Sequence, residues 1–157
     1  MRIGIGYDVH TFKKGRKLIL GGVQLDYAEG LDGHSDADVL VHAIMDSLLG
    51  AAGLPDIGVH FPDNDMAYKD ISSIELLGRV GKIIKKAGYT VVNIDTVLIL
   101  EKPKISAYSE EMKKNIAGAL KINKDCIGLK ATTTEGLGFT GRGEGAAAHA
   151  VSIINEL

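Results

Sequence analysis

The first ten residues constrain the fold strongly, because they combine a strand pattern with two side chains of metal-binding type. Within Arg2–His10, bulky apolar residues at odd positions alternate with glycine or aspartate, which is the two-residue period of a β-strand. Asp8 and His10 are two residues apart, so a strand would direct both side chains to the same face of a sheet. A helix that brings His42 to that face would place one carboxylate beside two imidazoles.

Asp8, His10 and His42 would form a suitable ligand set for a divalent metal such as zinc. Three protein ligands leave a fourth position open for a substrate, which is typical of a catalytic metal rather than a structural one. The alternative is that these are scattered polar residues, since Asp-x-His alone is a common pattern. Asp46 follows His42 by four residues. We expect it to be a solvated acid, and the alternative is that it orients the imidazole of His42.

The composition indicates one globular domain over residues 1–157, with 45% hydrophobic and 24% charged residues. A net charge of −2 and only 5% aromatic residues argue against nucleic acid or an anionic membrane as a partner. No leader-type segment opens the chain and no apolar run approaches about 18 residues, so we expect a cytoplasmic protein. The single cysteine, Cys126, cannot form an internal disulfide, and we expect it to be buried.

Hydrophobic periodicity and turn residues predict the order strand, hairpin, helix, helix, strand, helix, strand, strand. This order favours an α+β fold, a ferredoxin-like mixed β-sheet with helices on one face plus an N-terminal β-hairpin. The expected elements are a strand over Arg2–His10, a hairpin over Lys17–Tyr27, a helix from Ser35 to about Ala52 with Ser35 and Asp38 as a capping box, an ordered loop over Leu54–Asp70, a helix from Ser72 or Ser73 to Lys86, a strand over Tyr89–Leu100, a helix opened by Pro103 and continuing to Leu120, a strand over Ile127–Thr133, a glycine-rich turn over Thr134–Gly145, and a strand over Ala146–Ile154.

Two further motifs suit phosphate. His34 and Ser35 would lie at the N-terminus of the first helix, where free N–H groups and the helix dipole favour an anion; simple capping and a surface position are the alternatives. Thr132–Glu135, followed by closely spaced glycines, suits a diphosphate with Mg²⁺, and the alternative is a flexible turn. Gly136–Gly141 spells G-x-G-x-x-G, but the helix, strand and acid of a Rossmann fingerprint do not follow it.

Three other features are less specific. The acids of Asp56–Asp65 are explained by turn chemistry, and the alternative is that they bind Mg²⁺ or a ribose. His60 has no obvious partner, and we expect it at the surface. We expect His149, in the apolar last strand, to be a core or interface histidine rather than a ligand.

Several of these motifs occur together, in one order, in a known enzyme family. They are Gly6–His10, Gly33–Asp38, Asp56–Gly58, Phe61–Asp63, Pro103–Lys104, Lys130–Glu135 and Leu137–Gly145. The chain resembles the 2-C-methyl-D-erythritol 2,4-cyclodiphosphate synthases of the non-mevalonate isoprenoid pathway from Arg2 to Val151.

The resemblance implies a homotrimer with three active sites at subunit interfaces. It implies that 4-diphosphocytidyl-2-C-methyl-D-erythritol 2-phosphate cyclises to 2-C-methyl-D-erythritol 2,4-cyclodiphosphate, because the 2-phosphate attacks the β-phosphorus and CMP leaves. Such an enzyme is a metal-dependent phosphorus–oxygen lyase. The predicted Asp8 cluster would hold Zn²⁺ or Mn²⁺, and Glu135 would hold a Mg²⁺ or Mn²⁺ that bridges the α- and β-phosphates. His34 and Thr133 match the groups that stabilise the transition state.

The resemblance also implies substrate contacts. Ser35 and Asp63 would hold the methylerythritol phosphate, and Asp56 and Gly58 would meet the ribose. A neighbouring subunit would supply the cytidine pocket, and an axial cavity of the trimer would bind isoprenoid diphosphates. The implied substrate-binding residues are Asp8, Val9, His10, His34, Ser35, Asp56, Ile57, Gly58, Phe61, Pro62, Asp63, Asn64, Asp65, then Leu100, Glu101, Lys102, Pro103, Lys104, Ile105, Ser106, Ala131, Thr132, Thr133, Thr134 and Glu135 around the cytidine and its phosphates, and Phe139 and Arg142 at the axial cavity.

The chain departs from the family pattern at three positions. Gly136 stands where lysine is common, Pro55 where glycine is frequent, and His149 where glutamine often occurs. None of them is a predicted metal ligand, but Gly136 bears on phosphate affinity and on the rigidity of the turn.

Two other functions fit the same residues. A metal-dependent phosphohydrolase would use the metals to activate water instead of an internal phosphate, although no clear general base stands beside the cluster. A trimeric binding module would hold a nucleotide or an isoprenoid diphosphate through Phe139 and Arg142 without catalysis. The products, CMP with a cyclic or a linear diphosphate, distinguish the two enzymes.

Overall fold

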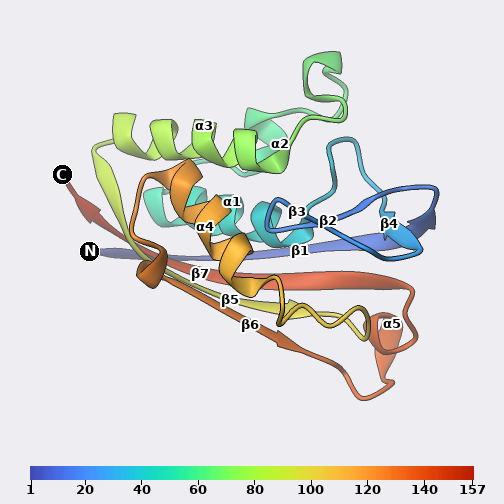
Figure 1. The fold of residues 1–157 in the computed structure, drawn as a ribbon. Helices are drawn as coiled ribbons and strands as arrows, with labels where there is room; N and C mark the ends of the chain where they lie inside the picture. Colours follow the sequence, from blue (N-terminus) through green and yellow to red (C-terminus); the bar gives the residue numbers. More distant parts are fainter.

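The computed structural model describes all residues, 1–157, as one sheet covered by helices on a single face (Figure 1). Its elements are β1 (Arg2–Lys14), β2 (Leu18–Leu20), β3 (Val23–Leu25), β4 (Glu29–Leu31), α1 (Val39–Ala52), α2 (Ile57–His60), the 3₁₀ turn η1 (Met66–Tyr68), α3 (Ser73–Lys86), β5 (Tyr89–Ile99), α4 (Ser109–Leu120), η2 (Lys124–Cys126), β6 (Ile127–Thr132), α5 (Gly138–Gly141) and β7 (Gly145–Glu156).

The main sheet has five strands in the order β4-β1-β7-β5-β6. β5 and β6 are parallel, and all other neighbours are antiparallel, which confirms the predicted mixed sheet. β2 and β3 form the predicted hairpin as a separate two-stranded sheet. The long elements follow the order β-α-α-β-α-β-β, whereas ferredoxin-like folds follow β-α-β-β-α-β. The ferredoxin-like comparison therefore describes the layers and not the connections.

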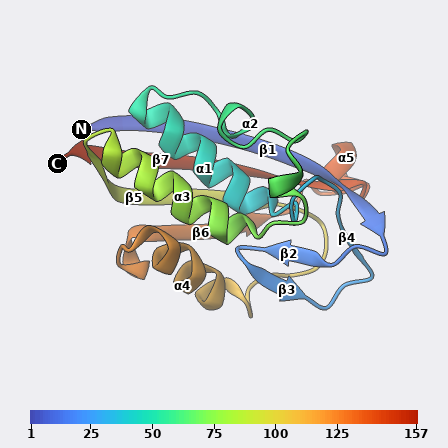
Figure 2. The ribbon, with the colours of Figure 1, turned by 90° about the horizontal axis from the view of Figure 1, so that it is seen from above.

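Helix α1 lies between the sheet and α3 (Figure 1). Seen from above, α1 and α3 run side by side over the strands (Figure 2). Eleven of the 14 residues of α1 are buried, as expected of a helix that is covered on more than one side. The apolar side chains of α1 pack in one continuous core with residues of β7, α3 and α4. No helix combines the length and the apolar character that crossing a membrane requires.

The backbone of α1 rests directly on β1 because two strand residues on that side have no side chain. A Cβ at Gly4 would lie 2.0 Å from the carbonyl oxygen of Ser47, and one at Gly6 would lie 2.0 Å from that of Ala43. The opposite face of β1 carries the bulky residues of the alternation, and Ile3 and Ile5 are 70% and 71% exposed. The predicted strand is confirmed, and its alternation separates a face for α1 from an open apolar face.

Helix α1 begins at Val39, so the predicted start at Ser35 is wrong. The N-cap is Asp38, whose Oδ1 accepts the N–H of Val41 at 3.2 Å. The same buried carboxylate accepts the N–H groups of Gly21 at 3.0 Å and Gly22 at 2.7 Å, in the turn of the β2–β3 hairpin. Burial, with the nearby charge of Asp36, raises the pKa of Asp38 to about 7 although these hydrogen bonds oppose the rise. One side chain thus attaches the hairpin to the helix.

Other differences concern short elements that periodicity does not detect. The helix expected to open at Pro103 begins at Ser109. The expected loop Leu54–Asp70 contains α2 and η1, and the glycine-rich turn contains α5. Asp56 and Asp65 cap α2 and η1 through the N–H groups of Val59 and Ala67, which explains those acids by turn chemistry. The residue Cys126 is half-buried instead of buried.

We expect Gly6→Ala to lower the free energy of unfolding by about 2–3 kcal/mol or more, because the added methyl group meets helix backbone that cannot move alone. Gly118→Ala is the matched control, since a Cβ on this exposed glycine of α4 meets nothing within 4 Å and should stabilise the helix by about 0.5–1 kcal/mol. Urea unfolding measures both. Equal stability of the two variants would contradict the close contact of α1 with β1.

Candidate metal centre and its cavity

Asp8, His10 and His42 come together as predicted. Asp8 Oδ2 lies 2.9 Å from His10 Nε2 and 3.0 Å from His42 Nδ1, and the two imidazole nitrogens are 3.2 Å apart. One ligand atom from each side chain lies within 4.8 Å of the others. The side chains of Asp8 and His10 project from the face of β1 that packs on α1, and His42 lies in the first turn of α1. The close approach of the two backbones at Gly4 and Gly6 therefore brings His42 within reach of the other two side chains.

The three side chains also perturb one another electrostatically. Burial alone would raise the pKa of Asp8, but hydrogen bonds and charge from His10 and His42 lower it to about 2. Burial alone would lower the pKa of His10, but its hydrogen bond with Asp8 and the charge of Asp8 raise it. Asp8 therefore remains ionised at neutral pH, as a metal ligand must.

The remaining hydrogen bonds of the two histidines favour metal binding. His10 Nδ1 lies 2.6 Å from the carbonyl oxygen of Asp32, and a carbonyl only accepts, so this nitrogen carries a proton and Nε2 is the ring nitrogen that a cation would take. His42 Nε2 contacts the hydroxyl groups of Ser35 at 3.2 Å and Ser73 at 3.0 Å. With one carboxylate and two ring nitrogens directed to a common point, the donor set fits a divalent cation.

A cavity of about 200 Å³ opens beside the cluster. His34 lies at its wall, with Nε2 at 3.1 Å from the carbonyl oxygen of Asp65. The lining residues are Asp8, His10, Gly33, His34, Ser35, His42, Met45, Ile57, Gly58, Phe61, Asp63, Tyr68 and Leu76. Of the predicted substrate-binding residues nearby, Asp56, Pro62, Asn64 and Asp65 belong to the same segment but do not line the cavity.

Two predictions about this region are wrong. His34 and Ser35 do not lie at the N-terminus of α1, because the helix begins four residues after Ser35 and the carboxylate of Asp38 takes the capping position. Asp46 is neither a solvated acid nor a partner of His42. Its Oδ1 accepts the N–H of Ile57 at 2.9 Å, so it anchors α2 at the cavity wall.

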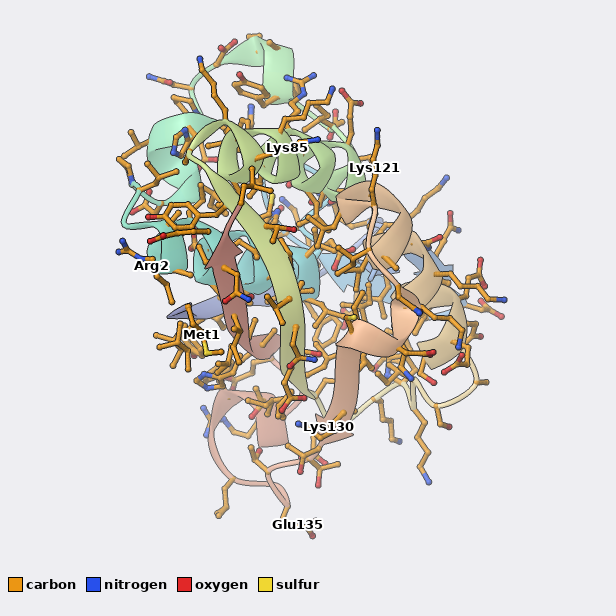
Figure 3. The ribbon with its side chains drawn as sticks, turned by 90° about the vertical axis from the view of Figure 1, so that its left-hand side faces the viewer. Met1, Arg2, Lys85, Lys121, Lys130 and Glu135 are labelled. Atoms are coloured by element: carbon orange, nitrogen blue, oxygen red, sulfur yellow. The ribbon has the colours of Figure 1, made fainter.

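The second group of predicted residues lies elsewhere on the chain. Leu100–Ser106 follows β5 and Ala131–Glu135 ends β6, and β7 and β5 separate β6 from β1 in the sheet. None of these residues lines the cavity. Figure 3 shows Glu135 at the tip of the loop after β6. There Thr133 Oγ1 donates to Glu135 Oε1 at 3.0 Å, and Glu101 Oε1 accepts the N–H of Thr134 at 3.0 Å.

The remaining predicted residues lie outside both groups. Val9 is on the open face of β1 and is 43% exposed. Phe139 is in α5, and Arg142 pairs with Glu144 at 2.7 Å. His149 is exposed beside Tyr7, with ring centroids 4.8 Å apart, so it is not a core histidine of this chain. His60 is half-buried against Phe61, with its Nε2 buried and without a partner, rather than free at the surface.

Sequence reasoning missed Asp32, Asp36 and Ser73, which surround the metal ligands. Ser73 reaches His42 across 31 positions of the chain, and Asp32 reaches His10 across 22. A serine at the start of a predicted helix has an ordinary explanation as a cap, so the sequence carries no signal for a contact with a distant histidine.

A mixed sheet with helices on one face, and three side chains that could hold a divalent cation beside a cavity, defines a class of small α+β proteins with a candidate metal centre. The YgbB family model matches residues 1–155, and the chain belongs to this family. The predicted family resemblance is therefore confirmed.

Particular relatives are named 2-C-methyl-D-erythritol 2,4-cyclodiphosphate synthase. The relative from Pelotomaculum thermopropionicum is 59% identical over 156 residues, which are 99% of this chain and 96% of that protein. The solved IspF of Plasmodium falciparum in complex with CDP is 35% identical, with a TM-score of 0.86 over 99% of this chain and 96% of its own. The bifunctional IspDF of Campylobacter jejuni is 42% identical with a TM-score of 0.95, and here the chain spans 42% of the longer protein.

We expect His42→Ala to weaken zinc binding at least about 100-fold, since removing a ligand costs more than removing a group that only orients one. His149→Ala is the matched control, because this histidine is exposed and does not belong to the cluster. Metal content after gel filtration and titration with zinc measure the effect. Zinc retained at full stoichiometry by the His42 variant would contradict the ligand assignment.

Proposed function

We propose that the protein converts 4-diphosphocytidyl-2-C-methyl-D-erythritol 2-phosphate to 2-C-methyl-D-erythritol 2,4-cyclodiphosphate and CMP. The observation that carries the proposal is the similarity over nearly the whole chain to synthases that bear this product's name. The Asp8, His10 and His42 cluster beside a cavity supports it independently. Because the substrate is a highly charged nucleotide derivative, we place the reaction in the cytoplasm.

The reaction is an intramolecular phosphoryl transfer, which makes the enzyme a phosphorus–oxygen lyase. An oxygen of the 2-phosphate forms a bond to the β-phosphorus, and the bond from that phosphorus to the bridging oxygen breaks. CMP leaves with the electron pair of that bond. The protein has little covalent chemistry to perform, so its contribution is to hold the two phosphates close and to neutralise their charge.

The charged and hydroxyl side chains divide this work. When bound, Zn²⁺ or Mn²⁺ at the Asp8 cluster and Mg²⁺ or Mn²⁺ at Glu135 supply positive charge to the diphosphate. His34, at the cavity wall beside the cluster, and Thr133 direct hydrogen-bond donors to the oxygens on which charge develops. In the free chain the Thr133 hydroxyl donates to Glu135, and a cation on that carboxylate would release the hydroxyl hydrogen for the substrate.

The substrate's two ends lie against different segments. Ser35 and Asp63 hold the methylerythritol phosphate, and Asp56–Gly58 meets the ribose. Four of these residues line the cavity beside the cluster, namely Ser35, Ile57, Gly58 and Asp63, whereas Asp56 does not. A neighbouring subunit supplies the cytidine pocket of each active site, through its loop Leu100–Ser106 and its segment Ala131–Thr133.

A homotrimer is part of the proposal, and two observations support it. Leu100–Ser106 and Thr133–Glu135 lie on the far side of the sheet order from β1, so one chain alone leaves the Asp8 cavity without them. The open face of β1 and β7 carries Ile3, Ile5 and Tyr7, all at least half exposed, and an apolar face of this kind is typical of a subunit interface. In this assembly Phe139 and Arg142 line an axial cavity that binds isoprenoid diphosphates.

The test is ³¹P NMR of the purified protein with the cytidylyl substrate, Zn²⁺ and Mg²⁺. We expect CMP to appear together with the coupled signals of an eight-membered cyclic diphosphate. Asp8→Asn should abolish this turnover while the chain stays folded and assembled, because a neutral amide cannot replace the anionic ligand.

Other outcomes would change the proposal. Linear hydrolysis products would make the enzyme a phosphohydrolase on the same scaffold. A folded, metal-loaded protein without turnover would leave a binding module. A trimer that collapses in the Asp8 variant would mean that the metal is structural.

We expect Ile5→Asp to convert the assembly to monomers, because the charged group would have to be buried in an apolar contact. Met66→Asp is the control, since Met66 is also 70% exposed but lies in η1, away from the sheet face. Light scattering during gel filtration measures the mass. An Ile5 variant with the same mass as the unsubstituted protein would exclude this face as the interface.

A further inference from the structure

Hydrogen bonds through Ser73 connect His42, a proposed metal ligand, to the carboxylate of Asp36. Ser73 Oγ lies 3.0 Å from His42 Nε2, and the same hydroxyl donates to Asp36 Oδ1. Asp36 Oδ2 accepts the backbone N–H of Ser73 at 3.0 Å. Ser73 is fully buried and His42 is 8% exposed, so the contact between these two side chains is shielded from water, whereas Asp36 is half-buried.

Each hydrogen bond that links Asp36, Ser73 and His42 has only one possible donor. A carboxylate without a proton only accepts, so the Ser73 hydroxyl must donate its hydrogen to Asp36. The oxygen of Ser73 then faces His42 Nε2 with a lone pair. A ring N–H at Nε2 satisfies that lone pair, whereas an unprotonated Nε2 would place two lone pairs against each other at 3.0 Å. On the other side of the ring, Asp8 Oδ2 lies 3.0 Å from Nδ1, so a cation held by both groups would stand there in place of a proton.

We propose that Asp36 and Ser73 are positioning residues that hold His42 with its proton on Nε2 and so direct the lone pair of Nδ1 to the metal. The inference rests on the metal site of the proposed function. It concerns residues that touch neither the metal nor the cavity wall, since neither Asp36 nor Ser73 lines the cavity.

Ser35 cannot perform this selection alone. Its Oγ lies 3.2 Å from His42 Nε2 and accepts the N–H of Ala37 at 3.2 Å, but no carboxylate captures its own hydrogen. That hydroxyl can donate to Nε2 or accept from it, and therefore suits both tautomers. Only the Ser73 hydroxyl donates its hydrogen to a carboxylate, so it can only accept a hydrogen from His42 Nε2.

The same hydrogen bonds link His42 to the start of α3. The N-cap residue of α3, Ser72, makes no side-chain cap hydrogen bond, and Asp36 instead receives the N–H of Ser73 at the first turn. A negative charge at a helix N-terminus is favourable. The carboxylate of Asp36 is therefore held in place by α3, and it holds the hydroxyl that orients His42.

The test compares Ser73→Ala with Ser47→Ala in the full chain. Ser47 is also fully buried and hydrogen-bonded, to Ile44 and Ser152, but it does not touch the cluster. Competition with a chromophoric chelator gives the zinc affinity of the metal-stripped proteins. We expect Ser73→Ala to weaken zinc binding by about 10–100-fold and Ser47→Ala to leave it within about twofold. Asp36→Asn, which keeps the shape of the side chain, is a second variant and should weaken binding in the same direction.

A spectroscopic readout separates orientation from stability. In the zinc-loaded protein, the ¹H–¹⁵N signal of His42 Nε2 should be that of a hydrogen-bonded, slowly exchanging proton in the unsubstituted chain and in Ser47→Ala, and it should move upfield and exchange faster in Ser73→Ala. Unchanged affinity and an unchanged Nε2–H signal in the Ser73 variant, or an equal loss in both serine variants, would overturn the inference. If the unsubstituted protein did not bind zinc, the metal site itself would fail, and this result is distinct from the other two.

Discussion

The direct contact between β1 and α1 is the feature on which the rest of the molecule depends. Gly4 and Gly6 bring a helix backbone onto a strand backbone without intervening side chains. This approach is closer than two layers with ordinary side chains allow. A metal ligand on the helix can then meet two ligands on the strand within hydrogen-bonding distance. The chemistry of the cluster is thus a consequence of two absent side chains.

Elements and ligands with a strong local pattern could be predicted from the sequence. The alternation of Arg2–His10 indicated both the strand and the common face of Asp8 and His10, and the longer helices and strands followed from their periodicity. Three-residue and four-residue elements such as η1 and α5 are too short for a period to show. The start of α1 was misplaced because Ser35 and Asp38 are both good capping residues, and only the hairpin turn determines which one serves.

The order of the strands in the sheet could not be predicted from the sequence, and it decides which of the predicted residues can share one site. Along the sequence, Thr133 and Glu135 follow one strand and His10 lies on another, and nothing local indicates that two other strands lie between them. The order β4-β1-β7-β5-β6 separates the two groups. Contacts such as Ser73 with His42 are similarly long in sequence, and they depend on how α3 packs on α1 rather than on any motif.

The cluster draws on segments that are otherwise far apart in the chain, since His42 lies 34 positions from Asp8 and 31 from Ser73. An ion that bound only the folded chain would therefore act as a cross-link between β1 and α1. At a free concentration 100 times its dissociation constant, such a ligand stabilises the folded state by about 2.7 kcal/mol. Metal supply and folding are then thermodynamically linked, and the protein resists unfolding best in the state in which it is ready to act.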